Sequence, residues 1–125
     1  LVIYATGYKV SFPFFEKSFL NVEEQNNLEL YQRVVHPDHP GLYFLAFIQP
    51  LGAIMPLAEV QSRWIAKLLT GECRLPDRQT MLRAIEADKA ALRKRYITSP
   101  RHTMQVDFYP YRESILREMK RMRVR

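Results

Sequence analysis

Glycine and cysteine are both scarce in this chain of 125 residues, which contains four glycines and one cysteine. A single cysteine excludes a disulfide within the chain, and such sparing use of cysteine is typical of a reducing compartment. No two glycines lie within two residues of each other, so the sequence has neither a Gly-x-Gly-x-x-Gly loop nor a P-loop. Cys-x-x-Cys and Gly-x-Ser-x-Gly motifs are also missing. No set of catalytic residues can be assembled from these motifs.

Potential metal ligands are sparse as well. His36 and His39 lie close together in the sequence with Asp38 between them, a combination that could suggest a metal site. However, residues 36–41 contain two prolines and a glycine, which favour a turn, and no further ligand cluster follows at metal-binding spacing. We therefore expect no metal site.

Residues 42–58 form a stretch of 17 residues without a charged side chain. A transmembrane helix needs about 20 predominantly apolar residues, and two prolines and a glycine interrupt this stretch. We expect a buried strand followed by a turn, and no membrane segment.

Charge is distributed unevenly along the chain. Residues 1–62 contain three basic and six acidic side chains, whereas residues 63–125 contain sixteen basic and seven acidic ones. One alternative is therefore a basic helical module that binds nucleic acid or another polyanion. The same charges are equally typical of the solvated faces of helices, so charge alone does not decide between these readings.

The apolar periodicity predicts an α/β chain with a few strands and three helices. The strands are expected at about residues 1–5, 29–35 and 42–48, and the helices at about 54–70, 78–96 and 111–122. Asp77 is well placed to cap the second helix, and Gly71 to end the first. Another alternative is thus a stand-alone helical interaction domain. It is disfavoured because several apolar residues, Val2, Ile3, Phe12, Phe14 and Phe15, have few expected partners within the chain.

Residues 49–56 join the last predicted strand to the first predicted helix, and Gln49 is their only polar side chain. A strand that turns through proline and glycine into a helix can aim the helix N-terminus at a ligand. A connector whose proline and glycine only set the backbone angles is the alternative, and pattern alone favours it.

Several segments together resemble the flavin-containing monooxygenases, which are class B flavoprotein monooxygenases. Residues 1–8 read Leu-Val-Ile-Tyr-Ala-Thr-Gly-Tyr, with Phe-Pro-Phe at 12–14. Residues 48–56 read Ile-Gln-Pro-Leu-Gly-Ala-Ile-Met-Pro, and Glu-Val-Gln-Ser-Arg-Trp follows at 59–64. Leu-Pro at 75–76 and the tyrosines at 109 and 111 also match. The resemblance covers nearly the whole chain in the right order, and the Gln-Pro-Leu-Gly-x-Ile-Met-Pro segment is its most specific part.

This resemblance implies an enzyme that uses FAD, NADPH and oxygen to oxygenate soft nitrogen or sulfur centres through a C4a-hydroperoxyflavin. Such enzymes bind FAD and NADP on two dinucleotide-binding domains, whose glycine-rich loops this sequence lacks. We therefore expect a C-terminal fragment that is inactive alone, an expectation that its apolar start without an initiator methionine also supports. Residues 1–10 would be the last strand and turn of the NADP-binding domain. Residues 11–125 would be the C-terminal part of the FAD-binding domain with a helical extension.

Carried over by position, the cofactor-binding residues are Thr6 and Gly7 at the end of the first strand, and Gln49, Leu51 and Gly52 beside the isoalloxazine ring. The resemblance supplies no catalytic residue from this chain. The expected partners are the N-terminal remainder of the same enzyme and a small amine or sulfide substrate, with no nucleic acid or membrane and a possible homo-oligomer. The basic end replaces the hydrophobic anchor of microsomal relatives, which implies a soluble, cytoplasmic, bacterial-type member.

Overall fold

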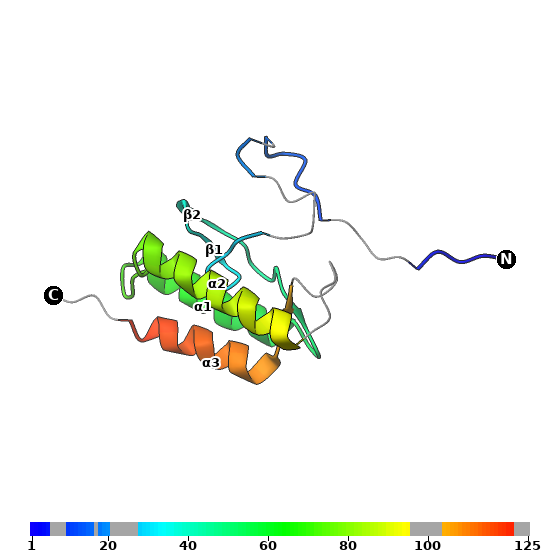
Figure 1. Cartoon of the computed structure of the whole chain (residues 1–125). Coiled ribbons are helices and arrows are strands. Elements are labelled where there is room, and N and C mark those ends of the chain that lie inside the picture. Colours follow the sequence, from blue (N-terminus) through cyan, green and yellow to red (C-terminus); the bar gives the residue numbers. More distant parts are fainter. Residues whose placement is uncertain (6–9, 17, 21–27, 96–103, 122–125) are drawn as a thin grey trace.

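The computed structural model describes residues 1–5, 10–16, 18–20, 28–95 and 104–121. Three helices make up most of its regular secondary structure, and two small sheets of two strands each accompany them (Figure 1). Among the described residues, no helix has the length and apolarity needed to cross a membrane.

The helices are α1 (Met55–Leu69), α2 (Arg78–Arg95) and α3 (Phe108–Met119). They confirm the prediction of three helices. The predicted start of the third helix at about residue 111 was wrong, because α3 begins three residues earlier. Pro110 lies in its first turn, where the missing N–H has no partner within the helix, so this proline does not prevent helix formation.

The ends of the helices follow the expected signals. Asp77 accepts a hydrogen bond from the Thr80 backbone N–H at 2.9 Å, and its other oxygen accepts one from the Thr80 hydroxyl at 2.7 Å. This is the predicted cap of α2. Gly71 follows α1 with φ of +73°, a conformation that glycine adopts without steric cost.

The strands are short and differ from the prediction. β1 (Val35–His36) and β2 (His39–Tyr43) form an antiparallel hairpin, and β3 (Gln49–Pro50) pairs in parallel with β4 (Gln105–Val106). The predicted strand at 1–5 is absent, because these exposed residues pair with no other strand in the described structure. Strands need such a partner for their backbone hydrogen bonds.

The predicted strand at 29–35 is mostly a turn. Gln32 and Arg33 have φ of 50° and 59°, so the chain reverses there and Tyr31 bridges to Val35. Propensity indicated a strand because apolar side chains occur on both sides of this turn.

The predicted buried strand at 42–48 was also wrong. The chain turns at Leu45 and Ala46, where Ala46 has φ of 59° and Leu45 is 52% exposed. The strand pairing that the apolar run suggested occurs earlier in the chain, in β2. Because β2 already begins within the expected turn at 36–41, only the middle of that segment is a turn.

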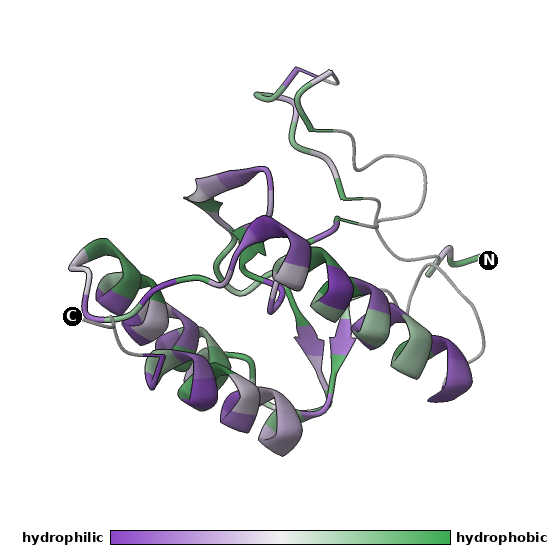
Figure 2. Cartoon of the chain, turned by 60° about the vertical axis from the view of Figure 1, so that its left-hand side comes forward, coloured by the Kyte–Doolittle hydropathy of each residue, from purple (hydrophilic) through white to green (hydrophobic). Residues whose placement is uncertain are grey.

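The main core is formed by buried side chains from the three helices and from the part of the chain that precedes α1. Figure 2 shows hydrophobic and hydrophilic residues alternating along each helix, as expected for amphipathic helices that bury one side. The fully buried side chains at its centre are Trp64, Leu57, Ile115, Gln61, Val34 and Val35. α1 and α3 pack against each other in this core.

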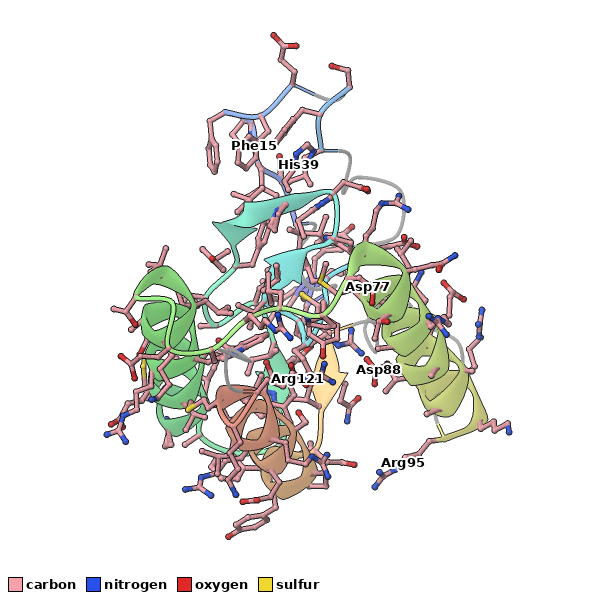
Figure 3. The ribbon with its side chains drawn as sticks, turned by 90° about the vertical axis from the view of Figure 1, so that its left-hand side faces the viewer. Phe15, His39, Asp77, Asp88, Arg95 and Arg121 are labelled. Carbon is pink, nitrogen blue, oxygen red and sulfur yellow. The ribbon has the colours of Figure 1, made fainter. Side chains whose placement is uncertain are left out.

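A second, smaller core forms around Phe44, with Leu20, Leu28 and Leu30 buried beside it. Phe12 packs against Phe44 with ring centroids 5.6 Å apart. Part of the N-terminal aromatic segment therefore does find partners within the chain, contrary to the expectation from sequence. Phe19 connects this segment to the hairpin, because its ring centroid lies 5.4 Å from that of Phe15 and 4.4 Å from that of His39, both of which are labelled in Figure 3.

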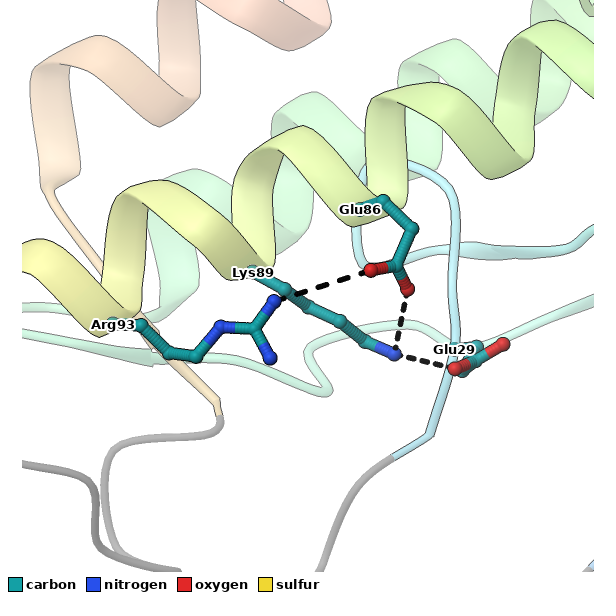
Figure 4. A network of polar contacts seen from close by, with 4 residues as sticks. All are labelled: Glu29, Glu86, Lys89 and Arg93. Atoms are coloured by element: carbon teal, nitrogen blue, oxygen red, sulfur yellow. Dashed lines mark hydrogen bonds and ion pairs between the residues drawn. The ribbon is translucent and has the colours of Figure 1, made fainter.

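Ion pairs connect α2 to this smaller core. The Lys89 ammonium contacts the carboxylates of Glu29 and Glu86, and Arg93 lies 4.0 Å from Glu86 (Figure 4). Arg33 pairs with Asp88 at 2.6 Å. These contacts hold the segment before β1 against the helix, although such exposed pairs are individually weak.

Candidate functional site

The residues predicted to bind the cofactor lie in two parts of the chain. Thr6 and Gly7 fall outside the described residues. Gln49 begins β3, and Leu51 and Gly52 follow on the short connection that leads from β3 into α1. The structure therefore places the second group on one continuous segment, which we call the 49–52 segment.

The backbone of this segment is fixed at its start by β4. The Gln49 N–H donates a hydrogen bond to the Met104 carbonyl at 2.8 Å, and Gln49 and Pro50 pair with Gln105 and Val106. The Gln49 side chain is exposed, so its amide remains accessible to a ligand. An amide group can both donate and accept hydrogen bonds.

Gly52 ends the segment in a conformation that other residues avoid. Its φ is +119°, and a Cβ added there would have no heavy atom within 4 Å. The glycine is therefore required by its backbone angle and not by crowding within the described chain. Its backbone can also approach a flat ligand closely.

The N-terminus of α1 follows directly. Ile54 is the N-cap residue, and no side-chain hydrogen bond caps the helix there. The first turn also contains no acidic residue. Pro56 occupies one of the first two helical positions, where its missing N–H costs least. This end of a 15-residue helix therefore keeps its partial positive charge.

Exposed apolar side chains flank Gln49 along the chain. Leu51 is 73% exposed, Met55 75% and Leu45 52%. Large apolar groups are rarely left in water when they lie close together along the chain, and such a patch is typical of a binding surface. The 49–52 segment and its neighbours along the chain thus offer one exposed amide and several exposed apolar side chains.

This set of groups fits the edge of a flavin ring. Flavin presents ring nitrogens and carbonyl oxygens that an amide can pair with, and its reduced form carries negative charge that a helix N-terminus favours. The segment does not fit the phosphates of a dinucleotide, because the sequence has no glycine-rich loop to hold them.

Two residues that sequence reasoning did not assign to a site are connected to the turn that precedes this segment. Gln61 of α1 accepts a hydrogen bond from the Ala46 N–H at 2.8 Å and donates one to the Tyr111 hydroxyl at 2.6 Å. The Tyr111 hydroxyl donates in turn to the Gln32 carbonyl at 2.8 Å. A sequence signal for Gln61 did exist, because it is a polar residue on the apolar stripe of its helix.

Burial raises the pKa of Tyr111 well above the ordinary tyrosine value. Burial also raises the pKa of Tyr31 to about 12, and a hydrogen bond to Glu118 adds to the effect. Both phenols therefore stay protonated at neutral pH and act as hydrogen-bond donors.

A cavity of about 330 Å³ lies elsewhere, between α2, α3 and the turn at Gln32. Arg33, Asp88 and Asp107 are among its polar lining residues, and none of the three residues of the predicted flavin contact lines it. The cavity therefore gives no independent support to the 49–52 segment.

The other expected sites can be placed as well. Within the described ranges, no group of three or more histidine, cysteine or acidic side chains could hold a metal ion. Several basic side chains of α2 are engaged by carboxylates, including Arg78 with Asp38 and Arg95 with Asp107. A basic surface for polyanions thus has fewer free charges on α2 than the sequence suggests.

Comparisons with known proteins agree with the resemblance. The family described as "FMO-like: Flavin-binding monooxygenase-like" matches residues 1–122. The chain is 42% identical over 117 residues to Flavin-containing monooxygenase 5 of Rattus norvegicus, covering 92% of this chain and 22% of that protein. It is 36% identical over 121 residues to Flavin-containing monooxygenase 2 of Homo sapiens, covering 95% of this chain and 22% of that protein.

A solved structure is similar as well. The structure of S-allyl-L-cysteine S-oxygenase from Allium sativum matches with a TM-score of 0.76 and 28% identity, over 96% of this chain and 28% of that one. The chain spans about a fifth of the length of the curated relatives it matches. Because the family match covers nearly the whole chain, this chain belongs to the flavin-binding monooxygenase-like family.

Proposed function

We propose that this chain forms the C-terminal part of an NADPH- and oxygen-dependent flavin monooxygenase that oxygenates soft nitrogen or sulfur centres. The observation that carries the proposal is the match of residues 1–122 to the family, combined with coverage of only 22% of its relatives. The glycine-rich loops for FAD and NADP would belong to the N-terminal remainder. The division at residue 10 between the NADP-binding and FAD-binding parts goes with this proposal.

FAD, when bound, would supply the oxygen-activating chemistry, and the protein would position it and exclude water. In this chain, the Gln49 amide would hydrogen-bond to the ring edge. The α1 N-terminus would favour negative charge at the ring. Leu51 and Met55 would cover apolar surface and keep water away from it. Thr6 and Gly7 would contact cofactor where the chain returns from the NADP-binding domain.

The proposal also assigns a partner to the exposed apolar residues. Leu1, Val2, Ile3 and Tyr4 are all at least 75% exposed, as is Phe14. Side chains of this kind would be buried against the N-terminal remainder of the enzyme. The substrate would be a small amine or sulfide and the enzyme cytoplasmic.

The upstream coding sequence gives a direct test. It should encode two Gly-x-Gly-x-x-Gly loops, each following a predicted strand and opening a helix. The full-length protein should then purify with bound FAD. A short upstream region without such loops, or a full-length protein that does not bind FAD, would contradict the proposal.

A further inference from the structure

Gln61 is unusual because its side chain is polar and completely buried. Its exposed fraction is 0%, and it lies on the same face of α1 as Leu57 and Trp64, which are also fully buried. A polar group in such surroundings is costly unless all its hydrogen bonds are made. The residues that satisfy it therefore indicate what the glutamine is for.

Those partners form a directed relay. The Ala46 N–H donates to the Gln61 Oε1, the Gln61 Nε2 donates to the Tyr111 hydroxyl, and that hydroxyl donates to the Gln32 carbonyl. The three distances are 2.8, 2.6 and 2.8 Å. The direction of these hydrogen bonds is fixed. If the Gln61 amide were reversed, its NH₂ would face the Ala46 N–H, and two donors would meet.

Both ends of the relay lie on strained backbone. Ala46 and Gln32 have φ of 59° and 50°, a left-handed conformation that is unfavourable for residues other than glycine. The structure has three such non-glycine residues among those it describes, and the relay bonds directly to two of them. Such conformations persist where the surrounding structure imposes them.

The relay also connects to the 49–52 segment. Ala46 lies three residues before Gln49, which is itself held by its backbone hydrogen bond to Met104. β4 follows Met104 and leads directly into α3, which carries Tyr111. The segment is thus fixed from two sides, by the relay at its approach and by β4 at its start.

We propose that Gln61 and Tyr111 are positioning residues, whose buried relay holds the turn at Ala46 so that the 49–52 segment meets the flavin ring in the required geometry. This inference rests on the proposed function. Neither residue is assigned a catalytic role, because both side chains are buried and their hydrogen bonds in the relay go to Ala46, to Gln32 and to each other.

The test uses two conservative variants of the full-length protein, Tyr111→Phe and Gln61→Met. Each keeps most of the side-chain volume and removes hydrogen bonds of the relay. Hydrogen exchange should become roughly tenfold faster at the Ala46 amide, while amides in the middle of α2 stay protected. The absorbance spectrum of bound FAD should shift in the same direction as in Gln49→Ala.

A double variant separates positioning from general destabilisation. If the relay acts through the 49–52 segment, adding Tyr111→Phe to Gln49→Ala should shift the flavin spectrum no further than Gln49→Ala alone. Ser62→Ala is the matched control, because its exposed hydroxyl on α1 bonds to the Glu59 carbonyl at 2.8 Å, which is not part of the relay. It should leave both the exchange at Ala46 and the spectrum unchanged.

Unchanged exchange at Ala46 in both relay variants would overturn the proposal. So would faster exchange with an unchanged flavin spectrum, since the relay would then be purely structural. A full-length protein that does not bind FAD would contradict the proposed function and the flavin part of this inference. Faster exchange at Ala46 in the relay variants would then still show that the relay holds the turn. Gln61→Met need not fold for the test to succeed, because Tyr111→Phe breaks the same relay.

Discussion

At the scale of single residues, backbone conformation restricts what the 49–52 segment can tolerate. Gly52→Ala should destabilise the protein by about 1–2 kcal/mol, because alanine is strained at a φ of +119° even with open space around it. Chemical denaturation of the variant measures this loss. Gly41 is the matched control, since it also has open space but no positive φ. Gly41→Ala should stay within about 1 kcal/mol of the parent, and an equal loss at both glycines would contradict this explanation.

Gln49 gives a second prediction, about the ligand and not about stability. Gln49→Ala should shift the absorbance of bound FAD and increase the NADPH consumed per molecule of substrate oxygenated. Its effect on unfolding should be within about 0.5 kcal/mol, since the side chain is exposed. Gln79→Ala, an exposed glutamine on α2, is the control and should change neither property. An unchanged spectrum and unchanged coupling in Gln49→Ala would remove Gln49 from the flavin contact.

Residue-level prediction from sequence succeeded where the cause is local. The Asp77 cap and the glycine after α1 depend on neighbours within a few residues, and both are present. The relay was not predictable in this way. Gln61 finds its partners 15 and 50 residues away, and no local pattern indicates which distant groups a buried glutamine will meet.

At the scale of elements, the hairpin of β1 and β2 should respond to pH. Burial lowers the pKa of His36, and the neighbouring His39 lowers it further, whereas Asp38 and Glu29 act in the opposite direction. The two imidazole rings lie with centroids 4.9 Å apart. Protonated His36 is therefore less favourable in the folded state than in the unfolded one.

The sign of the effect follows from proton binding. Below the ordinary histidine pKa of about 6.5, the unfolded chain binds more protons at His36 than the folded chain, so stability falls as the pH decreases. The contribution of this residue is complete above that pH. Denaturation midpoints measured from pH 7.5 to 5 should show the decrease, and His36→Gln should make it smaller. A slope that is identical in His36→Gln would contradict the assignment to this residue.

The packing of α1 against α3 gives a further prediction. Ile115 is fully buried in this contact, so Ile115→Ala should destabilise the protein by about 2–4 kcal/mol. Leu69 lies at the end of α1 and is 71% exposed, so Leu69→Ala should cost less than about 0.5 kcal/mol. Thermal unfolding of both variants tests this, and similar losses would show that the core has been placed wrongly.

Helices were easier to predict than strands for a physical reason. A helix makes its hydrogen bonds within one segment, so its apolar stripe and end signals are sufficient to place it. A strand needs a partner from elsewhere in the chain, and an apolar run does not say whether one exists. The run at 42–48 was accordingly misread, because the turn at Ala46 is imposed by contacts with α1 that the local sequence does not contain.

At the scale of the whole molecule, the chain combines a well-packed helical core with a large amount of exposed apolar surface. Apolar side chains gather in two clusters, yet Leu51, Met55 and Phe14 remain outside both and are at least 73% exposed. This surface is what the proposed N-terminal remainder would cover. Its presence could be anticipated from the family resemblance, whereas its location required the structure.

The most direct measurement is to add NADPH to the full-length protein without oxygen and then to admit oxygen with an amine or sulfide present, following the flavin absorbance throughout. The account predicts that NADPH bleaches the bound flavin, and that oxygen restores its colour with formation of an N- or S-oxygenated product. A flavin that NADPH does not reduce, or one that is reoxidised without product from any soft nitrogen or sulfur compound tested, would contradict the central claim.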